Sequence, residues 1–546
     1  MCERVRMKPR RFSVIDIGTN SARFLAAELL GDGTWKPIAD RREPCRLGEG
    51  LAAGNRLGDV PMQRAMAAVA AFVAASREVR APIVRAVATH AVRWAENRDE
   101  FLELLRKNTG VELVTIPPRV EGRLSYRAVA DLERAADRER LERIGVLDTG
   151  GGSVQFTVGV GDVPMASVSM PLGAVALTER FGGTEACAGE RFDEMREHIA
   201  RHVESALDGL PIGGARIFGV GGGCVSAGEL CRQRAAGTLS PGNPGVERLS
   251  KPRFDVTLAE VRDVLKLIRP MSAAERAALP GMAVERSQIM VAGLAVIEAI
   301  LSRASPHAMT TLTVGLRDGL VVEAAEMVRI RAAARATTQK LMLPAAAAAF
   351  AQRCRAEQPH SSHVAALAMR LHAELVRCAR ASQIRKGRWC RRRSAAILHA
   401  AALVHDTGVA ISYKGHHKHS ETLVTFNGLP GVKPGVAELV AATARYHRRA
   451  CPSKKHAVYG SLDKKDRRLV RMLGGILRVA DGLDRSHRQV VTDVRASVQE
   501  DQLRVVAISA DEPIAELAAA IKKSDLLVKA AGRPVSVAWQ AASPAS

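Results

Sequence analysis

Two apolar segments of the chain each run into a glycine-containing turn and then resume as a second apolar segment. The first is "FSVIDIGTNSARFLAAELL" at residues 12–30, and the second is "VLDTGGGSVQF" at residues 146–156. Apolar runs on both sides of a tight turn predict β-hairpins. The two segments align without a gap, and this alignment places Asp16 on Asp148. The pattern therefore indicates an internal duplication.

Alternating sheet and helix patterns follow each hairpin, so each copy predicts an α/β unit. After the first hairpin, the pattern predicts a helix at 62–79, a strand at 84–89, a helix at 91–108 and a strand at 111–116.

A third glycine turn occurs in "IFGVGGGCVSAGEL" at residues 217–230, where an apolar segment leads into a helical pattern. Phosphate-binding loops commonly stand at helix N-termini in this way. Glycine also permits positive φ and close backbone approach, so that successive N–H groups converge on an anion. One such turn is typical of an ordinary hairpin, whereas two matching turns predict a phosphate-binding cleft between related lobes.

Helical patterns dominate after residue 320. The alanine-rich stretch at 331–350 is predicted to link the lobes to a second module, with Pro344 at a helix boundary. Helical spacing of apolar residues continues at 363–379 and 394–408, and the segment 503–524 reads as a strand followed by a helix.

Length and composition narrow the class of protein. A chain of 546 residues is too long to fold around a single hydrophobic core, so its length predicts several domains. No apolar run reaches the roughly 20 residues of a membrane span, the first residues lack the apolar stretch of a signal peptide, and nine cysteines occur without a CxxC pair. We therefore expect a cytoplasmic protein without a disulfide framework or a cysteine-based zinc site.

The charge balance favours a polyanionic partner. The chain holds 80 Lys and Arg against 57 Asp and Glu, which gives a net charge of +23. Aromatic residues make up only 3%, which argues against a platform that stacks the bases of single-stranded nucleic acid. We expect no membrane partner and no specific nucleic acid, whereas a phosphate chain without bases fits.

Six ordered motifs resemble the exopolyphosphatase and guanosine pentaphosphatase family. They are "VIDIGTNSARFL", "ATHAVRWAENRDEFL", "EGRLSYRAV", "VLDTGGGSVQF", "GVGGGCVSAG" and "TVGLRDGL", and the resemblance spans roughly residues 10 to 325. It implies the duplicated, two-lobed α/β fold of actin-like proteins, followed by a mostly helical extension. The predicted domains are lobe I at 10–127, lobe II at 128–328, an α-helical domain at 340–495 and a small α/β segment at 496–546.

The resemblance also implies the chemistry, which is removal of a terminal phosphate by water. Glu121 matches the family's catalytic glutamate, which would orient and deprotonate that water. Asp148 is the candidate ligand for Mg2+ or Mn2+, because hard cations prefer carboxylate and phosphate oxygens. The predicted phosphate contacts are Thr19, Asn20, Ser21, Arg23, Arg93, Gly150, Gly151, Gly152, Ser153, Gly222 and Gly223.

Three positions depart from the family pattern. Gln155 stands where many relatives have a glutamate, Val120 stands beside the predicted base where relatives often have a second acid, and Cys224 replaces a threonine. These changes make the cleft less acidic. They predict weaker metal binding, together with slower turnover or altered substrate choice.

The second module contains His363, His405, Asp406 and Asp481 in the order H…HD…D, with further histidines nearby. This order resembles the metal-dependent phosphohydrolases named for their His-Asp pair, and it implies a second divalent metal site. The alternative is a structural remnant that extends the path of a polyphosphate chain, and the basic clusters of this half fit either interpretation.

Several functions stay open from the sequence. The leading hypothesis is an exopolyphosphatase, and the second is a guanosine pentaphosphate hydrolase with the same chemistry. An actin-like kinase is disfavoured because no adenosine-binding motif stands out. A non-catalytic sensor of alarmones or polyphosphate is the hypothesis from another class. The resemblance further suggests a homodimer.

Overall fold

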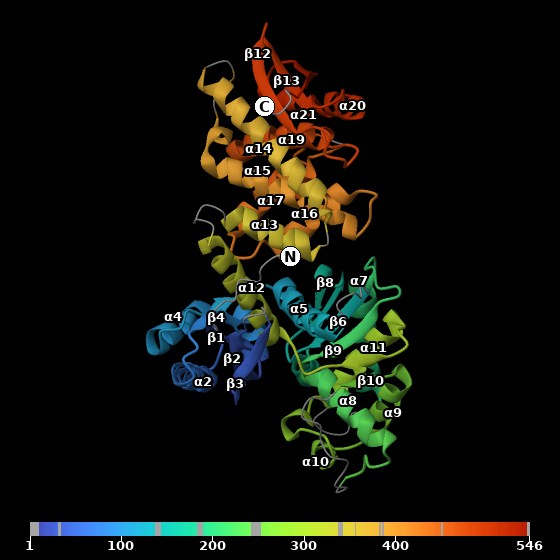
Figure 1. Cartoon of the computed structure of the whole chain (residues 1–546). Coiled ribbons are helices and arrows are strands. Elements are labelled where there is room, and N and C mark those ends of the chain that lie inside the picture. Colours follow the sequence, from blue (N-terminus) through green and yellow to red (C-terminus); the bar gives the residue numbers. More distant parts are fainter. Residues whose placement is uncertain are drawn as a thin grey trace. The chain divides into compact units, whose positions relative to one another are not determined.

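The computed structural model describes residues 10–30, 34–136, 143–182, 189–241, 253–336, 342–354, 356–381, 384, 387–448 and 451–542. The chain forms two compact units, Met1–Ala325 and Glu326–Ser546 (Figure 1).

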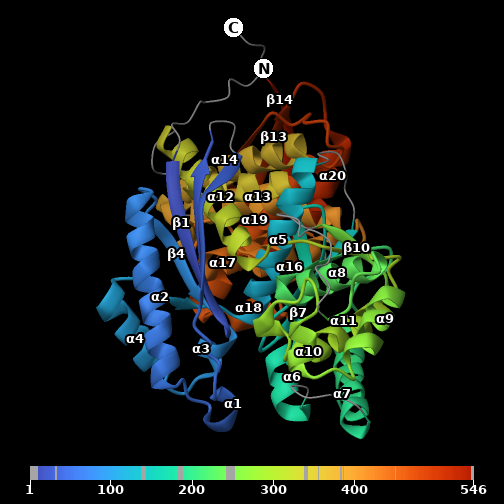
Figure 2. The same ribbon diagram turned by 90° about the horizontal axis from the view of Figure 1, so that it is seen from below.

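The first unit begins with a five-stranded sheet of order β3-β2-β1-β4-β5. Strands β1 to β3 are antiparallel, whereas β4 and β5 run parallel to β1. Helices α2 and α4 lie on one side of this sheet in both views (Figure 1, Figure 2). The elements are β1 Arg10–Ile17, β2 Ser21–Leu29, β3 Trp35–Pro44, α1 Leu51–Gly54, α2 Asp59–Glu78, β4 Ile83–Ala88, α3 His90–Trp94, α4 Arg98–Thr109 and β5 Val114–Thr115.

Helix α2 forms where the sequence pattern predicts it. Met62, Ala65, Val69 and Phe72 recur at helical spacing, and all four are buried. Phe72 stacks on Phe24 of β2, with ring centroids 5.6 Å apart. This contact anchors the helix to the hairpin that carries the first glycine turn.

The predicted helix at 91–108 is instead two helices, α3 and α4, with a break at Asn97. The Asn97 side chain accepts a hydrogen bond from Leu57 N at 2.8 Å and donates one to Leu57 O at 3.0 Å. These two bonds to a neighbouring segment replace helix continuation. The strand predicted at 111–116 also shrinks to the two residues of β5 at the sheet edge.

The second sheet repeats the first, which confirms the internal duplication. Its order is β10-β11-β9-β6-β7-β8, so β8-β7-β6-β9-β11 matches β3-β2-β1-β4-β5, again with three antiparallel strands followed by two parallel ones. The elements are β6 Arg143–Thr149, β7 Val154–Val160, β8 Val163–Met170, α6 Ala174–Phe181, α7 Glu190–Leu207, β9 Arg216–Val220, α8 Gly221–Ala235, β10 Phe254–Val256, α9 Leu258–Ile268, α10 Ala273–Ala277, α11 Met290–Ala304 and β11 Met309–Thr311.

Two helices join the sheets. Helix α5 (Pro118–Ala136) follows β5 and packs on β6, β7 and β8, so the predicted lobe boundary at residue 127 falls inside it. Helix α12 (Leu316–Ala336) approaches α5 so closely that a Cβ on Gly319 would lie 2.0 Å from Leu124 O. Glu323 of α12 also forms an ion pair with Arg123 of α5 at 2.8 Å.

The second unit is mostly helical and includes a small sheet of order β12-β13-β14. The predicted strand and helix at 503–524 are β13 and α20. Helix α20 packs on α19, where a Cβ on Gly482 would lie 2.7 Å from Ala520 Cα. The elements are α13 Met342–Arg353, α14 Gln358–Arg380, α15 Arg392–Val404, α16 His416–Asn427, α17 Pro434–Arg445, α18 Ala457–Ser461, α19 Lys464–Gly482, β12 Asp493–Gln499, β13 Gln502–Ser509, α20 Ile514–Lys523, α21 Asp525–Ala531 and β14 Val535–Ala541.

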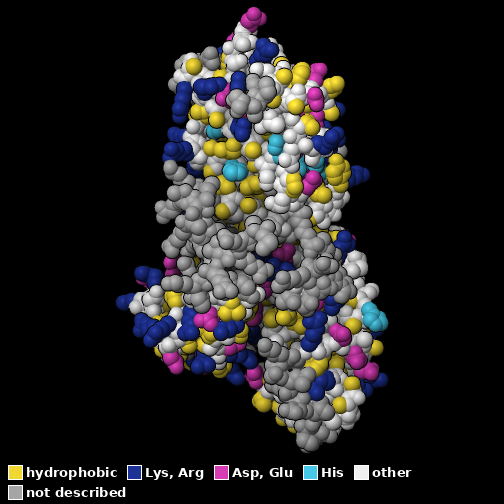
Figure 3. Space-filling view, viewed as in Figure 1, with side chains coloured by type: hydrophobic (Ala, Val, Ile, Leu, Met, Phe, Trp, Pro, Cys, Tyr) yellow, Lys and Arg dark blue, Asp and Glu magenta, His cyan; other side chains and the backbone are white. Residues whose placement is uncertain are grey.

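The surface carries the excess of basic residues. On the face that Figure 3 shows, Lys and Arg side chains are spread over both units. Among the helices of the described ranges, none combines the length and hydropathy that a membrane crossing requires.

Candidate functional site

The two hairpin turns are structurally equivalent. Gly18 N donates to Ser21 O at 3.1 Å in the first turn, and Gly150 N donates to Ser153 O at 3.1 Å in the second. The turns also lie close together, since a Cβ on Gly151 would be 3.8 Å from Thr19 Cβ. The gap-free alignment of the sequence therefore corresponds to two matching turns at one place in the fold.

The third turn packs against the second. Gly221 has φ +81°, and a Cβ there would lie 2.8 Å from Asp148 Oδ1. A Cβ on Gly222 would overlap the Arg286 guanidinium, with Nη2 only 1.6 Å away. Helix α8 starts at this turn without a side-chain cap. The glycines thus let a helix N-terminus, a carboxylate and a guanidinium meet at one point.

The three turns line one cavity of about 470 Å³ in the first unit. Among the described residues, those lining it include Glu121, Asp148 and every predicted phosphate contact except Arg93. The predicted contacts on its wall are Thr19, Asn20, Ser21, Arg23, Gly150, Gly151, Gly152, Ser153, Gly222 and Gly223.

Asp16 and Asp148 occupy equivalent places at the ends of β1 and β6. Burial raises the pKa of Asp16 to about 6, although Arg23 and Arg317 lower it. Burial also raises the pKa of Asp148, against the hydrogen bond that Ser125 donates to its Oδ2. Two carboxylates in one cavity repel each other unless a proton or a cation neutralises them.

These carboxylates fit a divalent cation. Asp16 Oδ1 is buried and has no hydrogen-bond partner among the described residues. Hard cations take carboxylate oxygens and phosphate oxygens together, and both would meet at this cavity wall. The donor set therefore matches the metal that the sequence predicts, with Asp16 joining Asp148.

Helix α5 positions Glu121 in its first turn. A Cβ on the next residue, Gly122, would lie 2.4 Å from both Ser167 Oγ and Thr157 Oγ1. Only glycine permits this approach of α5 to β7 and β8, and the approach brings Glu121 to the cavity wall. Glu121 itself is only 6% exposed.

The environment of Glu121 suits a general base at neutral pH. Burial raises its pKa to about 7, whereas Arg93 lowers the pKa through charge and a hydrogen bond. Arg93 Nη1 donates to Glu121 Oε1 and, at 2.7 Å, to Ile116 O. Arg93 thus lies against the carboxylate and does not line the cavity.

Four guanidinium groups surround the acidic groups of the cavity: Arg23, Arg42, Arg286 and Arg317. Arg23 and Arg42 are cross-strand partners in the register of β2 and β3. Burial and the charges of Arg42 and Arg23 lower the pKa of Arg286 to about 10. Arg317 pairs with Asp40 at 2.5 Å and Arg42 with Glu285 at 3.6 Å, and both carboxylates also line the cavity. Arg23 and Arg286 are therefore the guanidinium groups best placed to contact a bound anion.

The departures from the family pattern are buried or half-buried here. Gln155 is 3% exposed, and its Nε2 donates to Ser153 Oγ at 2.8 Å and to Ser169 Oγ at 3.4 Å. Cys224 is also buried, which raises its thiol pKa to about 12, so it remains a neutral thiol. Val120 is half-buried next to Glu121. Because Gln155 donates to Ser153, the Ser153 hydroxyl keeps its own proton for another acceptor.

In the second unit, the structure brings His405, Asp406 and Asp481 together but leaves His363 out. His363 Nε2 lies 2.9 Å from Val491 O, which takes that ring away from the cluster. His360, one turn earlier on α14, stands in its place, with Nε2 3.6 Å from Asp481 Oδ1. The sequence order H…HD…D thus fits, with a different first histidine.

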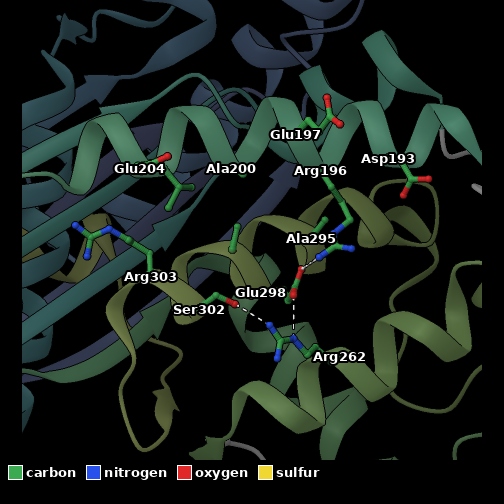
Figure 4. Close-up of a pocket in the computed structure, with 12 residues that line it drawn as sticks. Asp193, Arg196, Glu197, Ala200, Glu204, Arg262, Ala295, Glu298, Ser302 and Arg303 are labelled. Atoms are coloured by element: carbon green, nitrogen blue, oxygen red, sulfur yellow. Dashed lines mark hydrogen bonds and ion pairs between the residues drawn. The ribbon is translucent and has the colours of Figure 1, made fainter.

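A larger hollow of about 800 Å³ lies among α7, α9 and α11 of the first unit (Figure 4). Its buried Glu298 is paired with Arg262 at 2.9 Å and with Arg196 at 3.5 Å, and Arg262 also donates to Ser302 at 3.1 Å. These groups satisfy one another, so we do not assign the functional site to this hollow.

The fold and the cleft define a class of protein: a duplicated, two-lobed, actin-like protein whose cleft is suited to phosphate groups. A model of the Ppx/GppA phosphatase family matches residues 30–327, and a model of Ppx/GppA phosphatase domain III matches residues 344–523. The chain belongs to the Ppx/GppA phosphatase family. It is therefore a phosphatase of the group that contains exopolyphosphatases and guanosine pentaphosphate phosphohydrolases.

Individual relatives agree with this assignment. A guanosine-5'-triphosphate,3'-diphosphate pyrophosphatase of Photobacterium profundum is 24% identical over 84% of this chain and 85% of its own. An uncharacterized protein of Streptomyces coelicolor is 29% identical over 57% of this chain and 89% of its own. The structure of an exopolyphosphatase from Cytophaga hutchinsonii, 22% identical, covers 58% of this chain and 98% of its own with a TM-score of 0.50, which confirms the fold.

Sequence reasoning did not single out Asp16, Arg42, Arg286 or Arg317 as site residues. A signal for Asp16 was present, because the alignment of the two hairpins already placed it on Asp148. A signal for Arg317 was present as well, because it lies in the motif "TVGLRDGL". Arg42 and Arg286 come from β3 and from the segment before α11, outside the six motifs.

Proposed function

We propose that the cleft of the first unit hydrolyses the terminal phosphoanhydride bond of inorganic polyphosphate. The observation that carries this proposal is the buried Glu121, with its pKa raised to about 7, on the same cavity wall as the glycine turns. A base near neutrality and a set of anion-binding groups are what hydrolysis of a phosphate chain requires.

In the proposed reaction, a water oxygen attacks the terminal phosphorus and forms the new P–O bond. Its proton passes to Glu121, whose orientation is fixed by the hydrogen bond from Arg93. The bond between the terminal phosphorus and the bridging oxygen breaks, and the shortened chain leaves with that oxygen. The transition state spreads negative charge over the phosphoryl oxygens, so positioning and electrostatics provide most of the acceleration.

Residues of the cavity wall are suited to contact the negative phosphate oxygens and a metal cation. Arg23 and Arg286 provide guanidinium donors, and the hydroxyls of Ser21 and Ser153 stand at the turns that line the cavity. Asp16 and Asp148 would hold Mg2+ or Mn2+, which when bound neutralises phosphoryl oxygens.

Guanosine pentaphosphate is the second candidate substrate, for two reasons. The Photobacterium profundum relative, which aligns over most of this chain, is named for that type of substrate. In addition, Trp94 is 63% exposed and its ring lies 6.0 Å from that of His90, a residue on the cavity wall. An exposed indole offers a face on which a purine can stack.

Phosphate release by the pure protein with Mg2+ tests the proposal, with long-chain polyphosphate and guanosine pentaphosphate offered in parallel. A higher kcat/KM for polyphosphate supports an exopolyphosphatase. A higher kcat/KM for guanosine pentaphosphate, reduced in Trp94→Ala, selects the second candidate. Binding of either compound without phosphate release would overturn both and identify a sensor.

A further inference from the structure

Six side chains of metal-ligating types, four histidines and two aspartates, converge in the second unit, outside the cleft described above. They form two groups, in each of which the ligand atoms lie within 4.8 Å of one another: His360, His405 and Asp481, and Asp406, His416 and His447. These residues come from α14, the end of α15, the start of α16, the end of α17 and α19. Separate elements thus deliver six ligands to one place.

Hydrogen bonds fix the orientation of the four imidazoles. The Nδ1 atoms of His405, His416 and His447 lie 2.7 to 3.0 Å from the backbone carbonyls of residues 402, 413 and 444. A carbonyl oxygen only accepts, so each Nδ1 carries a hydrogen, and the neutral form of each ring presents a lone pair at Nε2. Asp484 accepts from His360 Nδ1 in the same way, at 2.8 Å.

These lone pairs point at one another. His416 Nε2 and His447 Nε2 are 3.1 Å apart, and in their neutral forms neither ring has a hydrogen left to place between them. His360 Nε2, His405 Nε2 and Asp406 Oδ1 are buried and have no hydrogen-bond partner within the described ranges. Buried acceptors that face each other cost free energy unless cations lie between them.

The distances around Asp406 and His416 are close to those of metal coordination, and those between Asp481 Oδ1 and the Nε2 atoms of His360 and His405 are a few tenths of an ångström longer. Atoms bound at about 2.1 Å to one ion lie about 3.0 to 3.4 Å apart in octahedral or tetrahedral geometry. Asp406 Oδ1 lies 3.1 Å from His416 Nε2 and 3.5 Å from His447 Nε2. It also lies 3.6 Å from His405 Nε2, a member of the other group. Asp406 therefore stands between the two groups as a shared carboxylate.

Residues behind the six side chains form hydrogen bonds to them, as in known metal centres, where such hydrogen-bond partners orient the ligands. Lys523 of α20 donates to Asp481 Oδ2 at 2.5 Å, which leaves Oδ1 toward His360 and His405. Helix α20 is thus tied to the centre through Asp481.

We propose that the second unit contains a two-cation centre, with one divalent ion bound by His360, His405 and Asp481, the other by His416 and His447, and Asp406 shared between them, and that this centre binds a phosphate group. It is independent of the hydrolytic cleft proposed for the first unit.

The charge of the centre favours phosphate. Two divalent ions outweigh the two carboxylates that hold them, so the centre attracts an anion. Arg448 Nη1 lies 3.5 Å from His416 Nε2, beside the centre. Tyr413 is 67% exposed, and its ring lies 5.5 Å from the ring of His416. The Arg448 guanidinium lies 6.0 Å from the Tyr413 ring. A guanidinium and an exposed aromatic face beside the centre suit the phosphate ester of an aromatic compound, such as a nucleotide.

Manganese tests the centre without reliance on activity. The full chain is incubated with Mn2+, freed of loosely bound ions by gel filtration, and analysed for Mn2+ per chain and by electron paramagnetic resonance. We expect at least two Mn2+ ions per chain, because the cleft of the first unit can hold a further ion, and the exchange-coupled spectrum of neighbouring ions. A protein that retains no Mn2+, or only uncoupled Mn2+, contradicts the two-cation centre.

Variants locate the ions. His405→Ala and Asp406→Asn should lose the coupled spectrum, whereas the matched control His363→Ala should keep it, because that ring bonds Val491 O instead. Asp148→Asn, which alters the cleft of the first unit, should keep it as well. Circular dichroism of each variant checks that the fold is intact. A coupled spectrum that survives in folded His405→Ala, or disappears in Asp148→Asn, would place the ions elsewhere and overturn the assignment.

Inorganic phosphate tests the ligand. When phosphate bridges two Mn2+ ions, the exchange coupling changes, so we expect added phosphate to alter the coupled spectrum, and added sodium chloride of equal ionic strength to leave it unchanged. An identical spectrum with and without phosphate would refute phosphate binding at this centre.

Discussion

Arg93 donates a hydrogen bond to Glu121 from a different helix, and the same guanidinium nitrogen donates to Ile116 O at 2.7 Å. The two bonds join α3 to the start of α5. Because Arg93 forms a hydrogen bond with one oxygen of the carboxylate, the orientation of Glu121 does not depend on the substrate. The pair also balances two opposing effects on the Glu121 pKa, since burial raises it and the Arg93 charge lowers it.

The first prediction concerns pH. A carboxylate acts as a base only when it is deprotonated, and the pKa of Glu121 is about 7. We therefore expect kcat/KM for phosphate release to fall below about pH 7. Replacement of Arg93 by Met removes the charge that lowers this pKa, so the acidic limb should move to higher pH. A profile that stays flat between pH 5 and 8 in both proteins argues against Glu121 as the base.

The second prediction concerns Gly122. Alanine there would bring a Cβ to 2.4 Å from Ser167 Oγ and Thr157 Oγ1. We expect Gly122→Ala to lower the free energy of unfolding by about 1–3 kcal/mol and to reduce kcat, because α5 must shift and carry Glu121 with it. Gly54→Ala is the matched control, since a Cβ added at Gly54 would meet nothing within 4 Å. Denaturant unfolding and phosphate release measure both effects, and equal behaviour of the two variants would refute the close packing.

The third prediction concerns Ser125, which donates to Asp148 Oδ2 and does not line the cavity. Loss of an outer partner of a metal ligand typically weakens metal binding about 10- to 100-fold. We expect Ser125→Ala to raise the Mg2+ concentration that gives half-maximal phosphate release by this factor. An unchanged Mg2+ requirement would show that Asp148 does not hold the metal.

The fourth prediction concerns Gln155, the cross-strand partner of Asp148. A glutamate there adds a carboxylate to the cation site, so Gln155→Glu should lower the Mg2+ concentration needed for half-maximal activity. Gln63→Glu on the exposed side of α2 provides the same charge change away from the cavity. If wild type and Gln155→Glu require the same Mg2+ concentration, Gln155 does not weaken the site.

Much of the fold of the first unit was predictable, because the same pattern of apolar residues and glycines occurs twice in the sequence and aligns without a gap. The two hairpins and the third turn occur where the sequence predicts them. Details set by tertiary contacts were not predictable. The helix break at Asn97 depends on Leu57, forty residues away, and the shortness of β5 reflects its place at a sheet edge.

The sites show the same division. Local motifs found the glycine turns, Glu121 and Asp148, but gave Arg93 a phosphate-contact role although its guanidinium lies on Glu121. In the second unit, the sequence cannot decide between His360 and His363. The two lie three residues apart on α14, near the same face, and only the packing against β12 and its preceding segment turns His363 to Val491.

The central claim is that Glu121 activates the water in the cleft of the first unit. Its most direct test is phosphate release from long-chain polyphosphate and guanosine pentaphosphate at saturating Mg2+ by the wild type, Glu121→Gln and Glu103→Gln. Glu103 is an exposed glutamate of α4, so it controls for the change of charge. We expect Glu121→Gln to lose about 10²-fold or more of kcat on the preferred substrate and Glu103→Gln to keep it. Wild-type turnover by Glu121→Gln would contradict the assignment of the base.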